Sequence, residues 1–245
     1  QIPEVGLALA AKAAKINGVY SAMALLDLDT AKAKKYTDTK SVKEESGYTS
    51  PFCYPLWPCD RVGEYILAKS AVAGAMIQYM ASDNEDVPNQ SPSNHLLGVG
   101  GQCLEDGTEV YLDQDQANTV NGYGVTTAIN QNGYRLWGNY TGAYPASSDA
   151  KDIWFAVRRM FSWQGNNFIQ TYFDEVDDPM NNVLVQSVVD SENIRCSAYA
   201  PKYWAGASIE YKSDDNPKTA ILAGTMKFRQ HIAPYTPAQE IVDII

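Results

Sequence analysis

The chain has 245 residues and a formal charge of −10, which bound its size and its partners. A chain of this length buries most of its apolar surface in one large domain or two small ones, and we expect one dominant domain. The negative charge argues against nucleic acid as a partner, because nucleic acid is bound chiefly by Lys and Arg side chains that displace counterions. No apolar run reaches the length that spans a bilayer, so membrane insertion is not expected.

The first half of the chain alternates between apolar helices, short strands and polar loops. Residues 19–28 form an almost unbroken apolar run, the pattern of a strand covered on both faces. Asp113 stands before a polar helical stretch, where its carboxylate can cap the first turn. The elements predicted here, in chain order, are a helix over 3–17, a strand over 19–28, an exposed helix or mobile segment over 29–45, paired strands over 52–57 and 62–67, a helix over 70–80, a loop over 83–94, a strand over 109–112 and a helix over 114–121.

Residues 124–173 are the stretch around which the chain is organised. The runs 125–131 and 134–137 are rich in β-formers, and Asn132-Gly133 between them is the strongest short signal for a tight reversal. A strand pair is therefore predicted. After a loop, Ser148 and Asp149 supply a helix start, because their side chains can accept hydrogen bonds from the first turn.

One apolar stripe marks the long helix that follows. Its members recur at three- and four-residue spacings and are Ile153, Val157, Met160, Phe161, Phe168 and Tyr172. Trp154, Val157 and Phe161 are expected to face the sheet. Gly165 costs the helix about 1 kcal/mol, so a kink or a break into two helices is expected at residues 165–167. Arg158 and Arg159 point about 100° apart, so at most one faces the core, and we expect at least one to pair with an acidic side chain.

The last third of the chain again mixes helices and strands. The elements predicted are a helix that begins at Pro179, a strand around Ile209 and Tyr211, a short helix from Asn216-Pro217 to Gly224 and a strand over 226–232. Strands and helices are interleaved without a strict repeat, which indicates an α+β (mixed α/β) fold with a β-sheet flanked by helices.

No group of residues makes a convincing active site. Only two histidines are present, His95 and His231, so a zinc site or a Ser-His-Asp triad has few candidate members. The acidic cluster over 174–178 indicates a solvated helix boundary before Pro179 more than paired carboxylates for acid–base catalysis. We therefore expect no cofactor, no metal and no enzymatic activity. The four cysteines are predicted to be free, mostly buried thiols in a reducing compartment.

Three passages, which keep their order and span most of the chain, match a known pattern. Residues 132–141 read N-G-Y-R-L-W-G-N-Y-T and lead to D-I-W-F-A-V-R-R-M over 152–160; residues 91–98 contain Ser-Pro-Ser-Asn and Gly98; residues 224–241 run from Gly-Thr-Met-Lys-Phe to Pro-Ala-Gln-Glu-Ile. They resemble the "G-R-x-W-G-x-R-T … vRRl", "PSN…G" and "G-x-l-x-f … P-a-E-x-I" passages of the tail-sheath subunit of contractile phages. The chain departs from that pattern at two places. Tyr140 stands where the family has its second Arg, and Gln239 stands between Pro-Ala and the Glu.

This resemblance implies a structural function. Residues 1–245 would be the tail-sheath core domain of a subunit that polymerises around an inner tube and contracts to drive it into the host envelope. The implied partners are other sheath subunits, the inner tail tube protein and baseplate or tail terminator proteins, with no nucleic acid and no membrane insertion. The implied location is the virion tail of a phage, after assembly in the bacterial cytoplasm; a bacteriocin-like or other contractile injection machine is the alternative. Because the first residue is Gln1, we expect a fragment that lacks the natural N-terminal part.

The candidate interface residues lie in the helix and at the C-terminus. Sixteen tyrosines and five tryptophans fit a protein whose function is contact, since aromatic residues and Arg are enriched where subunits meet. The terminal run is apolar on both faces of any strand that it forms, so it is either central or covered by another chain. The resemblance implies the second, as an arm that adds a strand to a neighbour's sheet. The candidates are Arg158, Arg159, Ile241, Val242, Asp243, Ile244 and Ile245.

A second hypothesis comes from a different class of protein. Trp137, Trp154, Trp163 and Trp204 could form a sugar platform, with paired carboxylates that hydrolyse a glycan. This glycan-binding or glycan-hydrolysing protein requires its tryptophans to be exposed on one concave face.

Overall fold

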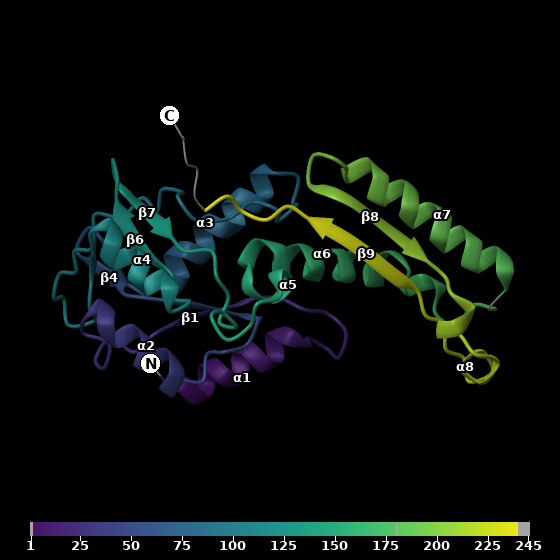
Figure 1. Ribbon diagram of the computed structural model, residues 1–245, viewed down its shortest axis with the longest axis horizontal. Helices are drawn as coiled ribbons and strands as arrows, with labels where there is room; N and C mark the ends of the chain where they lie inside the picture. The colour runs from purple at the N-terminus through teal and green to yellow at the C-terminus, as the bar shows by residue number, and fades with distance from the viewer. Residues whose placement is uncertain (1, 180, 240–245) are drawn as a thin grey trace. The chain divides into compact units, whose positions relative to one another are not determined.

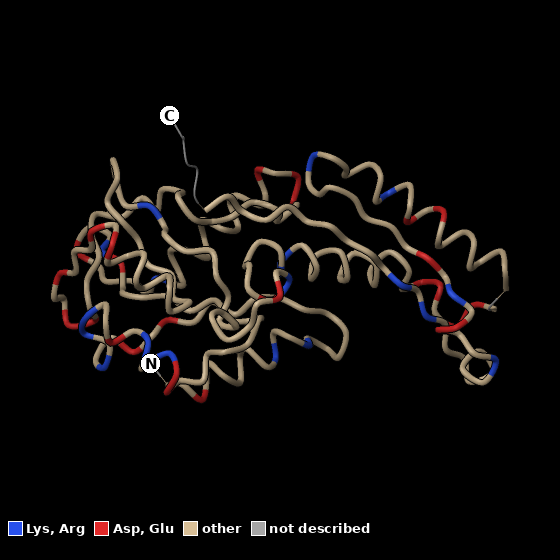
Figure 2. The backbone as a smooth tube through the Cα atoms, viewed as in Figure 1, with Lys and Arg blue, Asp and Glu red and all other residues tan. Residues whose placement is uncertain are grey.

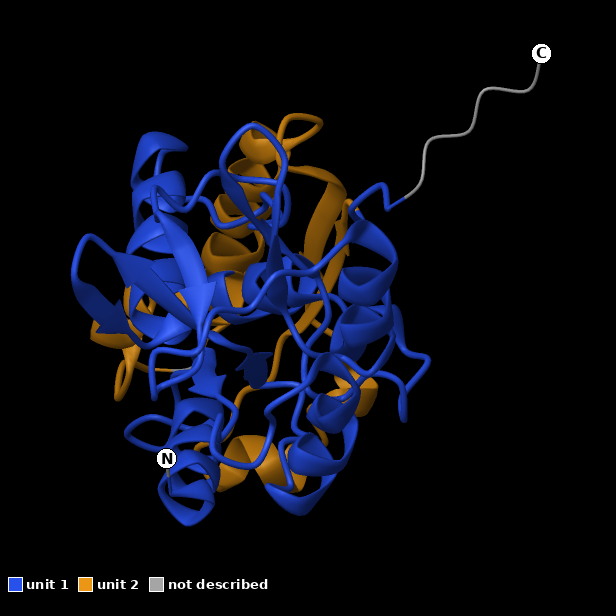
Figure 3. Ribbon diagram, turned by 90° about the vertical axis from the view of Figure 1, so that its left-hand side faces the viewer, with its two compact units in different colours: residues 1–163, 236–245 blue, residues 164–235 orange. Residues whose placement is uncertain are grey.

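The structure is a computed structural model that describes residues 2–179 and 181–239. Helices alternate with small sheets along the chain (Figure 1), as the predicted α+β class requires. The chain divides into two compact units (Figure 3): unit 1 contains residues up to 163 together with the segment from 236, and unit 2 contains residues 164–235. Helix α6 (Phe155–Thr171) begins in unit 1 and ends in unit 2.

In its described residues, unit 1 contains three small sheets and most of the helices. Strand β1 pairs in parallel with β2, β3 lies between β4 and β5 in an antiparallel sheet, and β6 and β7 form an antiparallel hairpin. The elements that precede α6 are α1 (Pro3–Ala14), β1 (Ala24–Asp27), η1 (Tyr36–Asp38), α2 (Thr39–Glu45), β2 (Cys53–Leu56), β3 (Cys59–Val62), β4 (Tyr65–Leu67), α3 (Lys69–Asp83), β5 (Gly101–Cys103), α4 (Gln114–Gly122), β6 (Thr127–Asn130), β7 (Tyr134–Trp137) and α5 (Ala150–Ile153).

The core of unit 1 is organised around β2, whose four residues are all buried. Tyr54 packs with Leu136 and Phe155 in one apolar cluster, and Trp57, directly after β2, packs with β1 and α4 in another. Each of these two large side chains also makes a hydrogen bond through its polar atom. The Tyr54 hydroxyl donates to the backbone oxygen of Gly138 at 2.8 Å, and the Trp57 indole donates to that of Ala33 at 2.8 Å. Buried aromatic residues therefore fix the loops around β2 as well as filling the core.

Charged residues of both signs are interspersed along the chain (Figure 2). The charged residues that are buried in the described part of the chain, Lys43, Asp60, Lys69 and Glu192, each have a polar partner. Lys69 and Asp60 form an ion pair whose side chains are both fully buried. The Lys43 ammonium donates to the backbone oxygens of Tyr123 at 2.9 Å and Tyr144 at 2.5 Å, and burial lowers its pKa to about 8. These contacts hold two loops of unit 1 together, at the desolvation cost that any buried charge carries.

Unit 2 pairs one long helix with a β-ribbon. Its elements after α6 are η2 (Phe173–Glu175), α7 (Asn182–Tyr199), β8 (Trp204–Glu210), η3 (Ser213–Asp215), α8 (Lys218–Leu222) and β9 (Arg229–Pro234). Strands β8 and β9 are antiparallel, and α7 packs against β8. Inside the unit, Glu192 is fully buried, pairs with Arg195 and accepts a hydrogen bond of 2.6 Å from the Gln164 amide. Trp204, also fully buried, donates from its indole to the backbone oxygen of Cys196 at 3.0 Å.

Several sequence predictions were correct. The helices predicted at the start of the chain, over 70–80 and over 114–121 are present, and Asp113 caps α4 through a 2.8 Å hydrogen bond from the Gln116 amide. The hairpin around Asn132-Gly133 is present as β6 and β7, with both turn residues at positive φ. All four cysteines are free and buried.

Other predictions were wrong in their bounds, pairing or exposure, because these depend on tertiary contacts that the periodicity of the sequence does not show. The strand predicted over 19–28 is limited to β1, but both of its faces are covered as predicted: Ala24 and Leu26 lie in one apolar cluster, and Leu25 packs against the other. The segment 62–67 contributes β4, which pairs with β3 and not with 52–57. Residues 109–112 form an isolated bridge at Glu109 instead of a strand. The segment 29–45, predicted to be exposed, contains α2 with Val42 and Lys43 buried.

The long helix also differs from its prediction. It breaks at Trp154, which is extended with φ −90° and ψ 121°, and it continues without a break through Gly165. The break has a local cause, because residues 139–141 pair with this point: the Thr141 amide donates to Ile153 and the Phe155 amide donates to Asn139, each at 2.8 Å. As a result Phe155, Val157 and Met160 are buried, whereas Trp154 and Phe161 are only half-buried.

Candidate interaction sites

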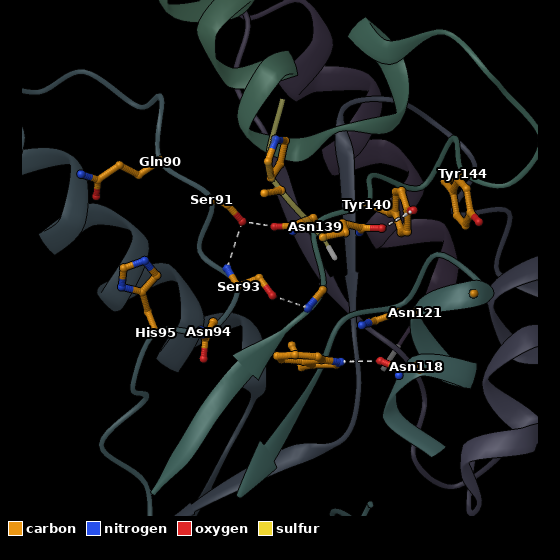
Figure 4. A pocket seen from close by; sticks show the side chains of 16 residues that line it. Gln90, Ser91, Ser93, Asn94, His95, Asn118, Asn121, Asn139, Tyr140 and Tyr144 are labelled. Carbon is orange, nitrogen blue, oxygen red and sulfur yellow. Dashed lines mark hydrogen bonds between the residues drawn. The ribbon is translucent and has the colours of Figure 1, made fainter. Parts of the chain in front are cut away.

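A cavity of about 850 Å³ in unit 1 brings together the passages that carried the sequence resemblance. Its walls come from the Ser-Pro-Ser-Asn loop, the end of β7 with the residues after it, α4 and the segment 237–239. Figure 4 shows His95 and Gln90 on one side of it and Asn118 and Asn121 on the other. Three passages that are far apart in the sequence therefore meet at one place.

Hydrogen bonds between its lining residues fix the wall of this cavity. The Gly138 amide donates to the Ser93 hydroxyl at 3.1 Å, and the Ser91 hydroxyl donates to the side-chain oxygen of Asn139. The Trp137 indole donates to Asn118 at 2.9 Å. These bonds explain why Ser-Pro-Ser-Asn and Trp-Gly-Asn occur together: the serines of the loop bind the backbone and the amide that follow β7.

The chemistry of this lining suits neutral polar groups. Its side chains are mainly amides, hydroxyls and aromatic rings, with no Lys, Arg, Asp or Glu in the lining of the described cavity. His95 is the one ionisable group besides the tyrosines, and partial burial together with the positive charge of Arg135 lowers its pKa. Amide side chains donate and accept at once, so such a wall matches peptide groups better than it matches ions.

Tyr140 lies at the edge of this cavity, in an aromatic stack. Its ring lies 3.7 Å from that of Tyr144 and 4.9 Å from that of Trp154, measured between centroids. Its hydroxyl donates to the side-chain oxygen of Gln239 at 2.9 Å. The two residues at which the chain departs from the family pattern are thus in direct contact.

The structure holds both predicted arginines against aromatic rings. Arg158 pairs with Asp152 at 3.1 Å and lies 4.1 Å above the Phe52 ring, which confirms the predicted acidic partner. Arg159 lies 5.4 Å from the Phe155 ring centre, and among the described residues it has no acidic partner. Burial lowers the pKa of Arg159 to about 10, partly opposed by Tyr54. The other predicted interface residues, Ile241, Val242, Asp243, Ile244 and Ile245, lie outside the described residues.

The ribbon in unit 2 offers backbone groups for pairing. In the described part of the chain, β8 and β9 pair only with each other, so each has an outer edge without a strand beside it. Exposure alternates along β9, with Arg229, His231 and Ala233 exposed and the residues between them half-buried. An unpaired strand edge is a template for a strand from another chain.

The two histidines considered for catalysis lie in different surroundings. His95 lies in the cavity wall of unit 1, whereas His231 pairs with Glu210 at 2.8 Å on the surface of unit 2. In the described residues, no group of three or more His, Cys, Asp or Glu side chains has a metal-binding arrangement. Trp204 is fully buried in unit 2, so it cannot contribute to a sugar platform, which required all of these tryptophans to be exposed. Nothing favours the glycan hypothesis.

Within residues 2–179 and 181–239, no helix combines the length and the apolar character that crossing a bilayer requires.

Known proteins that resemble this chain are contractile tail components. No protein-family model matches it. It is 28% identical over 180 residues to the major tail sheath protein of Serratia phage KSP20, across 71% of this chain and 44% of that protein. It is 23% identical over 215 residues to the tail sheath protein of Escherichia phage P2, across 82% of this chain and 52% of that protein. The chain therefore spans about half the length of these curated relatives.

Solved structures show the same fold. A chain of the anti-feeding prophage baseplate aligns with a TM-score of 0.76 at 20% identity, over 99% of this chain and 64% of that one. A chain of the PVC sheath complex in the contracted state, from an extracellular contractile injection system, aligns with a TM-score of 0.75 at 17% identity, over 90% and 62%. Together with the curated relatives, these structures confirm the resemblance to the contractile tail-sheath family that the sequence predicted, and its mixed α+β fold.

Proposed function

We propose that this chain is the core of a longer structural subunit of a contractile tail sheath, which polymerises around an inner tube and contracts to drive that tube into a host envelope. The observation that carries the proposal is that both curated relatives, aligned over 71% and 82% of this chain, are tail sheath proteins. The partners are other sheath subunits, the inner tube protein and baseplate or terminator proteins. The subunit acts by contact and not as an enzyme, in the virion tail of a phage assembled in the bacterial cytoplasm.

A contractile injection machine is the second candidate within this class. It is favoured by the fold, since the anti-feeding prophage and the PVC complex provide structures that align over 90% or more of the chain. The phage assignment is favoured by sequence, since the curated relatives are phage proteins. In both cases the subunit performs the same mechanical work.

Assembly would use the open edges of the β8–β9 ribbon. In this proposal residues 241–245 of one subunit add a strand to the ribbon of a neighbour, with main-chain hydrogen bonds that supply affinity. Support comes from the ribbon, whose outer edges have no strand partner among the described residues, and from the apolar character of the terminal run.

Arg159 is the arginine that better suits an interface. Arg159 is half-buried, and removing a guanidinium from water without an acidic partner costs free energy. A carboxylate from a neighbouring subunit would offset that cost. Arg158 already has Asp152, so its role in the interface is to hold the helix surface around Arg159. Replacement of Arg159 by Met should reduce assembly while the circular dichroism spectrum stays unchanged.

Negative-stain microscopy tests the proposal. The full-length protein should form tubes, whereas the same protein without residues 241–245 should not. Two replacements of this segment sharpen the test: Thr-Val-Thr-Val-Thr keeps strand propensity, and Gly-Ser-Gly-Ser-Gly does not. If main-chain pairing supplies the affinity, the first should restore tubes and the second should not. Tubes of undiminished length from the truncated protein would refute strand exchange, and the absence of any polymer from the full-length protein would refute the sheath function.

A further inference from the structure

Residues 236–239 follow unit 2 in the chain and belong to unit 1. A hydrogen bond holds them there, and its donor has a fixed position. Gln239 accepts a 2.9 Å hydrogen bond from the Tyr140 hydroxyl. The Tyr140 ring is stacked on Tyr144 with an interplanar angle of 5°, and on Trp154 with an angle of 24°. The backbone around it is also fixed, because Tyr140 and Trp154 form a β-bridge. The donor hydroxyl therefore has few alternative positions.

The contact is neutral on both sides. Burial and the neighbouring Tyr144 raise the pKa of Tyr140, so its hydroxyl keeps its proton near neutral pH. Gln239 carries no charge. An Arg at position 140 and a Glu at position 239 would instead carry opposite charges, and side chains of opposite charge in this geometry would form an ion pair.

We propose that Tyr140 anchors the root of the C-terminal arm through Gln239, and that this neutral contact makes the position of the root independent of salt. The recipient of the arm is a second copy of this chain, a part of the inference that rests on the proposed function; the anchor itself does not. An arm whose root is already fixed loses less conformational freedom when a neighbour binds its end. Because no charge takes part, ions do not screen the contact.

Hydrogen–deuterium exchange in the 245-residue chain tests the anchor directly. Tyr140→Phe keeps the aromatic stack and removes the hydroxyl, and Gln239→Ala removes the acceptor. Each change should speed exchange in peptides that cover residues 236–239 by about 2- to 10-fold, the range expected from the net contribution of one neutral hydrogen bond. Tyr65→Phe, at a site 75% exposed on β4, is the matched control and should change nothing there. Unchanged exchange in both test variants would overturn the anchor.

A charge swap tests the salt argument. Tyr140→Arg and Gln239→Glu, each made alone, should loosen residues 236–239, and the two together should restore protection at low salt. Raising NaCl from about 0.05 M to about 1 M should remove that restored protection, whereas the wild type should not respond. Gln114→Glu, an exposed site on α4, controls for the added charge. A wild type that loses protection with salt, or a double variant that never regains it, would overturn the neutral-pair inference.

The experiments can refute the role in assembly without refuting the anchor, and they can refute the sheath function without refuting the anchor. If Tyr140→Phe loosens the root in the 245-residue chain but the full-length variant polymerises as well as wild type, the anchor holds and its role in assembly is refuted. If wild-type full-length protein forms no polymer while the exchange results are as expected, the sheath function fails and the anchor stands.

Discussion

Replacement of Phe155 by Ala should be among the most destabilising single changes in unit 1. Its side chain is 1% exposed and its ring stacks on Tyr54 at 4.0 Å between centroids. Truncation of a fully buried Phe costs about 3–5 kcal/mol, which includes the transfer of the ring to water and the cavity left behind. Phe161, six residues later on the same helix, is half-buried, so its truncation should cost only about 1 kcal/mol.

Urea unfolding followed by circular dichroism and tryptophan fluorescence measures both costs. With a slope of about 2 kcal/mol per molar urea, Phe155→Ala should lower the midpoint by about 1.5–2.5 M and Phe161→Ala by about 0.5 M. Since the chain has two units, exchange of the β2 peptides should be recorded at each urea concentration to identify the transition of unit 1. A loss below about 1 kcal/mol for Phe155→Ala, or equal losses for the two variants, would refute the assignment of the buried face.

Three further outcomes are expected. Burial lowers the pKa of Lys43 to about 8 from the ordinary lysine value of 10.5, so the unfolded chain binds more protons than the folded chain between these two pH values. Wild type should therefore gain stability relative to Lys43→Met as pH rises through this window, and parallel urea midpoints would contradict this. Burial raises the pKa of Cys196 to about 11 and that of Cys59 to about 12. Both thiols should therefore resist a thiol reagent at pH 8 until urea unfolds the chain. Rapid labelling of the native protein would count against their burial. Glu192→Ala should destabilise unit 2 by about 3–5 kcal/mol, because Arg195 loses its buried partner; an unchanged fluorescence midpoint would show that the pair contributes little.

Local signals in the sequence determined the elements and the class of the fold. Asp113 and the Asn132-Gly133 turn act within a few residues of themselves, so their positions could be predicted and were correct. The resemblance to the sheath family could be predicted because it combined three passages that keep their order along the chain.

Tertiary structure alone decided which segments pair. The break at Trp154 depends on residues 139–141, and the burial of Lys43 depends on carbonyls of residues 123 and 144; such contacts leave no periodic signal in the sequence. The same reason explains the anchor. Sequence comparison marked Tyr140 and Gln239 as two separate departures from a pattern, but they are 99 positions apart, and only the folded chain places a phenol beside an amide and makes them one contact.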